Sequence, residues 1–84
     1  MKYAVEIAPV VDRQLQRFPK PDKRKILSKI ESLASEPRPY GYKELVGFKG
    51  FYRVRVGNYR IVYNIFDDIL IVSVIKVANR RDAY

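Results

Sequence analysis

The sequence predicts an α+β fold in which two helices pack on one twisted, mainly antiparallel sheet, with the element order β-α-α-β-β-β-β. Apolar residues recur with helical spacing in residues 9–34 and alternate with polar ones in residues 51–66, and residues 69–77 are almost continuously aliphatic. Because 84 residues suffice for one compact unit, we expect a single domain over residues 1–84.

The first strand and the first helix are predicted close to the N-terminus. Residues 2–7 alternate in the manner of a strand, and Pro9 suits the first turn of a helix because its missing N–H has no partner there anyway. The residues expected to face the core are Tyr3, Val5 and Ile7 in the strand, and Val11, Leu15 and Phe18 in the helix.

A second helix is predicted from about Pro21 until the proline-containing residues 36–39 end it. Its apolar stripe consists of Ile26, Ile30 and Leu33, with Leu27 and Ala34 beside it. Its outer face carries Lys23, Arg24, Lys25 and Lys29. We interpret these cations as an ordinary solvated face, with a binding role as the alternative.

The second half of the chain has the pattern of a sheet. The expected strands are Lys43–Val46, Phe51–Val56, Tyr59–Phe66 and Ile69–Val77. Gly57-Asn58 is predicted as a two-residue hairpin turn, with glycine supplying a positive φ, and Asp67-Asp68 as a second tight turn.

The composition favours polyanionic partners. The net charge is +8, and it is spread evenly: residues 1–42 hold nine basic and five acidic groups, and residues 43–84 hold eight and four. Cysteine and histidine are absent, which excludes disulfides, thiolate metal sites and a histidine base. We therefore expect no metal and no cofactor. No membrane span or signal peptide is evident, so a cytoplasmic location is expected.

The predicted hairpin determines which side chains share a face. If residues 57–58 form the turn, Arg55 lies opposite Arg60, and Arg53 lies opposite Val62. Opposed residues point to the same side of a sheet, as do residues two apart in one strand. Three arginines are therefore expected on one face. Like charges in opposition are destabilising, and guanidinium matches phosphate, so this face favours a phosphate ligand. The alternative is that the long side chains simply extend into water.

The last residues of the chain are expected to reach the same end of the sheet. The strand over residues 69–77 would run back toward the 57–58 turn and be followed by Arg80, Arg81 and Tyr84. Cations together with a ring that can stack on a base are typical of single-stranded RNA sites. The alternative for Tyr84 is a terminal ring that covers the sheet edge.

Three segments resemble the RelE toxins of the RelE/ParE superfamily. They are Leu45-Val46-Gly47, residues 51–63, which contain the run YRVRVGNYRIVY, and residues 74–84. The resemblance extends over the whole chain, and the order of elements matches the RelE fold. The central run is specific to the superfamily but less so to one activity, because ParE-type gyrase inhibitors share the fold and parts of the run.

The resemblance implies a toxin of a type II toxin–antitoxin system, a ribosome-dependent endoribonuclease that cleaves messenger RNA in the ribosomal A site without a metal. Its implied partners are a cognate antitoxin, the ribosome and messenger RNA. The catalytic residues it implies are Arg53, Arg55, Arg60, Arg80 and Tyr84, and Arg81 joins the four arginines in binding RNA phosphate. Candidate apolar anchors for the antitoxin are Phe48, Phe51 and Phe66.

The group that moves protons is left open by the sequence. Arginine does not lose its proton under ordinary conditions, Arg53 and Arg55 stand where lysine is common in the family, and Asn79 stands where many relatives have histidine. Tyr84, an unassigned lysine or groups of the ribosome would then transfer protons. Two other functions remain as alternatives: a ParE-type inhibitor that binds DNA gyrase, and a domain that binds RNA without cleaving it.

Overall fold

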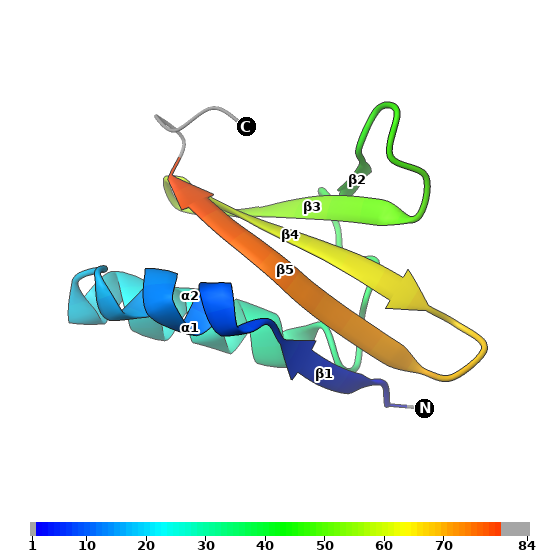
Figure 1. Ribbon diagram of the computed structural model, residues 1–84, viewed down its shortest axis with the longest axis horizontal. Coiled ribbons are helices and arrows are strands. Elements are labelled where there is room, and N and C mark those ends of the chain that lie inside the picture. The colour runs from blue at the N-terminus through cyan, green and yellow to red at the C-terminus, as the bar shows by residue number, and fades with distance from the viewer. Residues whose placement is uncertain (1, 80–84) are drawn as a thin grey trace.

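The computed structural model describes residues 2–79, which form one five-stranded sheet with two helices on one of its faces (Figure 1). The elements are β1 (Ala4–Ile7), α1 (Pro9–Gln16), α2 (Lys20–Ser32), β2 (Lys43–Glu44), β3 (Phe51–Val56), β4 (Tyr59–Phe66) and β5 (Ile71–Asn79). The strand order is β1-β5-β4-β3-β2; β1 pairs with β5 in parallel, and the other neighbours are antiparallel. The predicted α+β fold and element order are confirmed.

Both helices carry a proline in the first turn, as expected. Pro9 lies in the first turn of α1, and α2 begins at Lys20, with Pro21 in its first turn. Helix α1 ends at Gln16, so Phe18 lies beyond it, although its ring still packs against the core. Strand β2 is shorter than predicted: it ends at Glu44, although the Leu45 N–H still donates to the Phe51 carbonyl oxygen at 2.8 Å, and the chain then enters a loop in which Gly47 and Gly50 both adopt positive φ.

The core lies between the helices and one face of the sheet. The helices contribute Val11, Leu15, Ile26, Ile30 and Leu33; the sheet contributes Val54, Tyr59, Ile61, Tyr63, Ile65, Val72, Val74 and Val77. Tyr63 is fully buried at its centre, and its hydroxyl donates to the carbonyl oxygen of Pro37 at 2.7 Å. Burial raises the pKa of Tyr63, so the ring stays neutral and keeps this hydrogen bond.

The turn between β4 and β5 differs from the prediction. Instead of a two-residue turn at Asp67-Asp68, it takes four residues, and β5 begins at Ile71 rather than Ile69. Leu70 adopts the left-handed conformation with φ of 56°, and Ile69 is 60% exposed. Apolar character alone therefore did not reveal that these two aliphatic residues belong to the turn.

A β-bulge interrupts β5. Tyr63 pairs with Val74, but Val62 pairs with Lys76, so Ile75 is an extra residue between the two pairs. With an unbroken register, Lys76 would pair with Ile61, which is fully buried in the core. The bulge instead turns Lys76 to the sheet face away from the helices.

The hairpin of β3 and β4 is tied to the start of α2. The hydroxyl of Tyr59 donates to the Asp22 carboxylate at 2.8 Å, and the rings of Phe18 and Tyr59 are 4.7 Å apart between centroids. The hydrogen bond to Asp22 raises the pKa of Tyr59. Gly57 has a φ of 57°, as the predicted two-residue turn requires. The end of the hairpin is thus held against the helical layer.

An ion pair and a hydrogen bond join three segments that are distant in the sequence. Arg38, which follows α2, forms an ion pair with Asp67 at 2.9 Å, and the Tyr3 hydroxyl donates to the same carboxylate at 2.7 Å. The guanidinium of Arg38 also lies 5.6 Å from the ring centroid of Tyr52. The Arg38 hydrogen bond, followed by that of Tyr3, lowers the pKa of Asp67 to about 2.

This carboxylate should make stability fall in acid. Because the pKa of Asp67 drops from 3.8 to about 2 on folding, its contribution is complete above about pH 5 and is lost as the pH falls through 2. We expect Asp67→Asn to lower the urea midpoint at pH 6 and to match the wild type near pH 2. Asp68→Asn, whose carboxylate contacts only the neighbouring Ile69 N–H in the described structure, is the matched control. Equal losses from both variants at pH 6 would contradict the assignment.

Candidate functional site

The sheet face opposite the helices carries a groove of about 690 Å³, which we call the sheet groove. Its cations are Lys43, Arg53, Arg60 and Lys76, and Glu44 is the acidic residue among those that line it. Its apolar lining consists of Leu45, Val46, Phe48, Phe51, Val62 and Ile75. The site is therefore a shallow surface with a charged part and an apolar part.

The register of the strands explains why these cations meet. Lys43 pairs with Arg53, Arg53 with Val62, and Val62 with Lys76, so one row of neighbours crosses four strands. Directly paired residues point to the same side, and adjacent strands are about 5 Å apart. Val62 is only 5% exposed and lies outside the helix-side core, so it forms an apolar floor between the charges.

The predicted pairing of the arginines is confirmed, but only two of them line the sheet groove. Arg55 pairs with Arg60, one row nearer the turn than Arg53. Arg60 is half-buried, with its Nε shielded from solvent, whereas Arg55 is exposed and is not part of the groove lining. Arg60 stands on β4, the central strand of the five-stranded sheet, so it is the central cation of the candidate site.

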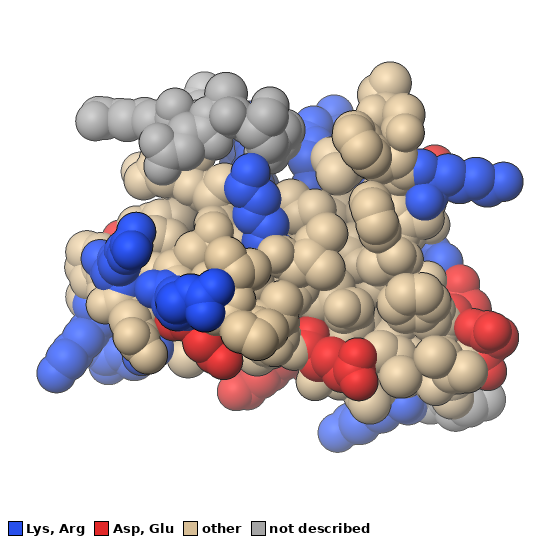
Figure 2. Space-filling model, viewed as in Figure 1, with Lys and Arg blue, Asp and Glu red and all other residues tan. Residues whose placement is uncertain are grey.

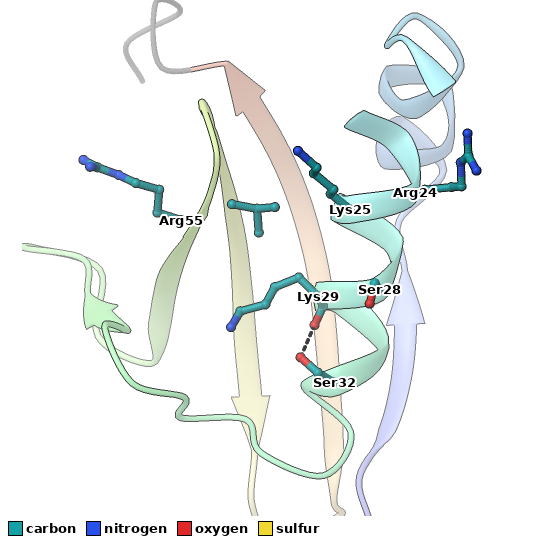
Figure 3. A pocket seen from close by; sticks show the side chains of 7 residues that line it. Arg24, Lys25, Ser28, Lys29, Ser32 and Arg55 are labelled. Carbon is teal, nitrogen blue, oxygen red and sulfur yellow. Dashed lines mark hydrogen bonds between the residues drawn. The ribbon is translucent and has the colours of Figure 1, made fainter. Parts of the chain in front are cut away.

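Arg55 instead borders a second hollow of about 580 Å³, between β3 and α2. Figure 3 shows Lys25 and Lys29 pointing from α2 toward the hairpin, while Arg55 extends from β3 away from the helix. Two of the lysines interpreted from sequence as a solvated face therefore stand beside the hairpin.

Lys76 is the cation of the sheet groove that no sequence signal revealed. It lies in a strand predicted as aliphatic and buried on both faces, and strict alternation would have directed it into the core. The bulge at Ile75 reverses that direction. Lys43 was also missed as a site residue, although the pairing of its strand with β3 follows from the predicted meander.

The apolar part of the sheet groove is unusually exposed. Phe48 is 61% exposed and Val46 is 97% exposed, both in the loop between β2 and β3. The rings of Phe48 and Phe51 are nearly parallel, 6.5 Å apart between centroids and 21° between planes. Exposed rings beside guanidinium groups suit a ligand that has both apolar and anionic parts.

Charge is unevenly distributed over the face of the molecule seen in Figure 2. In Figure 2, basic side chains gather over the end of the helical layer and along the upper side of the molecule, and acidic side chains lie mainly along the lower margin.

Of the predicted site residues, Arg80, Arg81 and Tyr84 lie outside the described residues. Within residues 2–79, no cluster of three or more His, Cys, Asp or Glu side chains is suited to hold a metal. No helix in that range is long and apolar enough to span a membrane.

Fold and site together define a small basic α+β protein with one open, cationic sheet face. Residues 5–84 match the family described as the ParE toxin of type II toxin–antitoxin systems. The chain belongs to this family, and hence to the RelE/ParE superfamily of toxins that the sequence indicated.

The named relatives are RelE proteins. The chain is 34% identical to a protein from Methanocaldococcus jannaschii named as the toxin RelE1, over all of this chain and 97% of the relative. It is similar to the RelE–RelB complex of Pyrococcus horikoshii, with 31% identity, a TM-score of 0.85, and coverage of 99% of this chain and 100% of that one. The RelBE2 toxin–antitoxin complex of Mycobacterium tuberculosis gives 25% identity, a TM-score of 0.83, and coverage of 95% and 100%.

The position of the arginines predicts a specific salt dependence for binding to a single-stranded RNA oligonucleotide. The slope of log affinity against log salt should be about −0.7 for each phosphate neutralised, and Arg60→Ala or Arg55→Ala should each flatten it by roughly one phosphate. The exposed Arg13 on α1 provides a matched control, since Arg13→Ala removes the same charge outside both hollows. If all three variants flatten the slope equally, overall charge rather than the sheet face binds the RNA.

Proposed function

We propose that this toxin is of the RelE type: a ribosome-dependent, metal-independent endoribonuclease that acts in the cytoplasm on messenger RNA in the ribosomal A site. The observation that carries the proposal is the strand register that gathers Arg53, Arg60 and two lysines in one groove open to solvent. The names of the relatives, which are RelE proteins, support the same choice.

The groove supports a reaction that depends on electrostatics and orientation. A ribose 2′-oxygen would attack the adjacent phosphorus, and the products would be a cyclic phosphate and a 5′-hydroxyl. Arg53 and Arg60 would hold the phosphoryl oxygens and stabilise the additional negative charge of the transition state. Arg55, at the rim, would bind a neighbouring phosphate. Arg80 and Arg81 would add positive charge, and Tyr84 would stack on a base.

The shallow groove fits the requirement for a ribosome. A surface of this kind does not enclose its substrate, so it cannot by itself bend a flexible RNA strand into line for attack. The ribosome would supply that constraint by fixing the messenger in the decoding site. Lys25 and Lys29, on the helical side of the hairpin, would then contact further RNA backbone.

A gyrase inhibitor is the second candidate, because the family description names ParE toxins. The two functions are separated by two assays with the same protein. Mapping messenger ends after incubation with translating ribosomes detects cleavage, and a DNA supercoiling assay detects gyrase inhibition. Inhibited supercoiling with intact messenger would replace the RelE proposal by the ParE one.

Loss of Arg60 should abolish most of the cleavage. Removing one charge-stabilising donor from a preorganised site typically costs about 10²- to 10³-fold in rate, and we expect this loss for Arg60→Ala and Arg80→Ala in single-turnover cleavage on programmed ribosomes. Arg60 lies outside the helix-side core, so the domain should remain folded by circular dichroism. Wild-type rates in both variants would rule out the site assignment.

The family membership implies a cognate antitoxin, and similar solved structures are toxin–antitoxin complexes. We propose that part of the antitoxin covers the exposed apolar wall of the sheet groove, where Phe48 and Phe51 stand beside the cations. An antitoxin segment with apolar and acidic side chains would match both parts. Its binding there would block access of RNA to Arg53 and Arg60.

This docking mode predicts that Phe48→Ala weakens antitoxin affinity by about tenfold or more, because truncating an aromatic anchor typically costs over 1 kcal/mol. Ile69→Ala is the control, since Ile69 is 60% exposed, like Phe48 at 61%, but lies at the β4–β5 turn. Calorimetric titration measures both affinities. The proposed contact fails if the two substitutions have the same effect, or if the antitoxin neutralises the Phe48→Ala toxin at unchanged dose.

A further inference from the structure

We propose that Lys76 is the general acid of the cleavage reaction and gives its proton to the 5′-oxygen that leaves the phosphorus. The inference rests on the proposed ribonuclease function and names one catalytic group within it. The arginines of the sheet groove can stabilise charge, but arginine does not give up its proton under ordinary conditions. A separate group must therefore protonate the leaving oxygen.

The described part of the groove offers three side chains that exchange protons with water: Lys43, Glu44 and Lys76. Lys43 and Glu44 form the short edge strand β2 and are both exposed. Glu44 also accepts a hydrogen bond from the backbone N–H of Gly50 at 3.2 Å, which directs its carboxylate to the loop. Lys76 is half-buried, on a strand inside the sheet.

The bulge in β5 gives Lys76 its position. It pairs with Val62, two residues along β4 and β5 from the pair of Arg60 with Ala78. Residues on neighbouring strands and two positions apart on one face are within reach of long side chains. The ammonium group of Lys76, which lies across from Val62, and the guanidinium of Arg60, which lies two residues before Val62 on β4, can therefore contact the same phosphate.

A bulge at this point disrupts the ladder between the two longest strands, β4 and β5, and bulges are characteristic of places where a side chain is re-aimed near an active site. Without the bulge the same lysine would face the core beside Ile61. The irregularity in β5 thus places a primary amine on the cationic face of the sheet. Lysine is also the one cation here that both stabilises charge and releases a proton.

The 2′-oxygen forms a bond to phosphorus and loses its proton to water, and the bond from phosphorus to the 5′-oxygen breaks. That oxygen takes a proton from the Nζ of Lys76, so the products are a 2′,3′-cyclic phosphate, a 5′-hydroxyl and a neutral amine. Water returns the proton to the amine before the next turnover.

Several charged groups surround this lysine and contribute to its environment. Within the groove they are Lys43 and Glu44 on β2, Arg53 on β3 and Arg60 on β4. Lys76 also borders a smaller hollow with Arg17 of the segment after α1. A test must therefore separate proton donation from the mere presence of a positive charge.

Lys76→Arg makes this separation, because it keeps the charge and removes the proton donor. Single-turnover cleavage on programmed ribosomes should fall by about 10²- to 10⁴-fold, the usual contribution of general acid–base catalysis, while the salt slope of RNA binding stays unchanged. Lys49→Arg is the control, since this exposed lysine is outside the groove lining and should retain wild-type cleavage. Thermal unfolding of each variant verifies that the fold is intact.

A substrate with sulfur in place of the scissile 5′-oxygen provides the decisive readout. A thiolate leaves without protonation, so Lys76→Arg should cleave this messenger within a few-fold of the wild-type rate, whereas Arg60→Ala should remain impaired. Such rescue would not occur if the lysine only supported the structure. Wild-type cleavage of the oxygen substrate by Lys76→Arg, or an unrescued loss on the sulfur substrate, would overturn the inference.

The two proposals fail in different ways. If the wild-type protein does not cleave messenger on ribosomes, the proposed function is wrong and the role of Lys76 falls with it. If the wild type cleaves and the sulfur substrate rescues Lys43→Arg instead, the ribonuclease function stands and the general acid is Lys43. Cleavage that is rescued in Lys76→Arg alone supports both.

Discussion

The pairing of β4 with both of its neighbours is the constraint on which the rest of the structure depends. One side of this strand supplies Ile61 and Tyr63 to the core, and the other side supplies Arg60 and Val62 to the sheet groove. Because side chains alternate along a strand, a shift of one residue would exchange the two sets. The register that buries Tyr63 is therefore the same register that presents Arg60.

Much of the fold and half of the site follow from local patterns in the sequence. Alternation in residues 51–66 and the Gly57-Asn58 turn correctly give the opposition of Arg55 and Arg60, since a two-residue turn leaves one register. The β4–β5 turn and the bulge at Ile75 do not follow, because Ile69, Leu70 and Ile75 have the aliphatic character of ordinary strand residues. Lys76 was missed for that reason: its direction is decided by tertiary pairing rather than by its neighbours in sequence.

The sheet groove combines two surfaces that small proteins usually keep apart. A domain of 84 residues buries only about two thirds of the surface of its unfolded chain, so some apolar side chains remain outside the core. Here Phe48 and Val46 are exposed next to Arg53 rather than dispersed. If RNA and an acidic antitoxin segment both bind here, as proposed, they compete for the same cations.

The side chain of Gln14 has a consequence for solubility. Strand β1 pairs with β5 only as far as Val74, and beyond that point the Val77 N–H donates to the Gln14 side-chain oxygen at 2.9 Å. Exposed strand edges are templates on which another chain can add a strand and aggregate. Because a donor in the middle of that edge already has a partner within the chain, the Gln14 amide makes β5 a poorer template for an added strand.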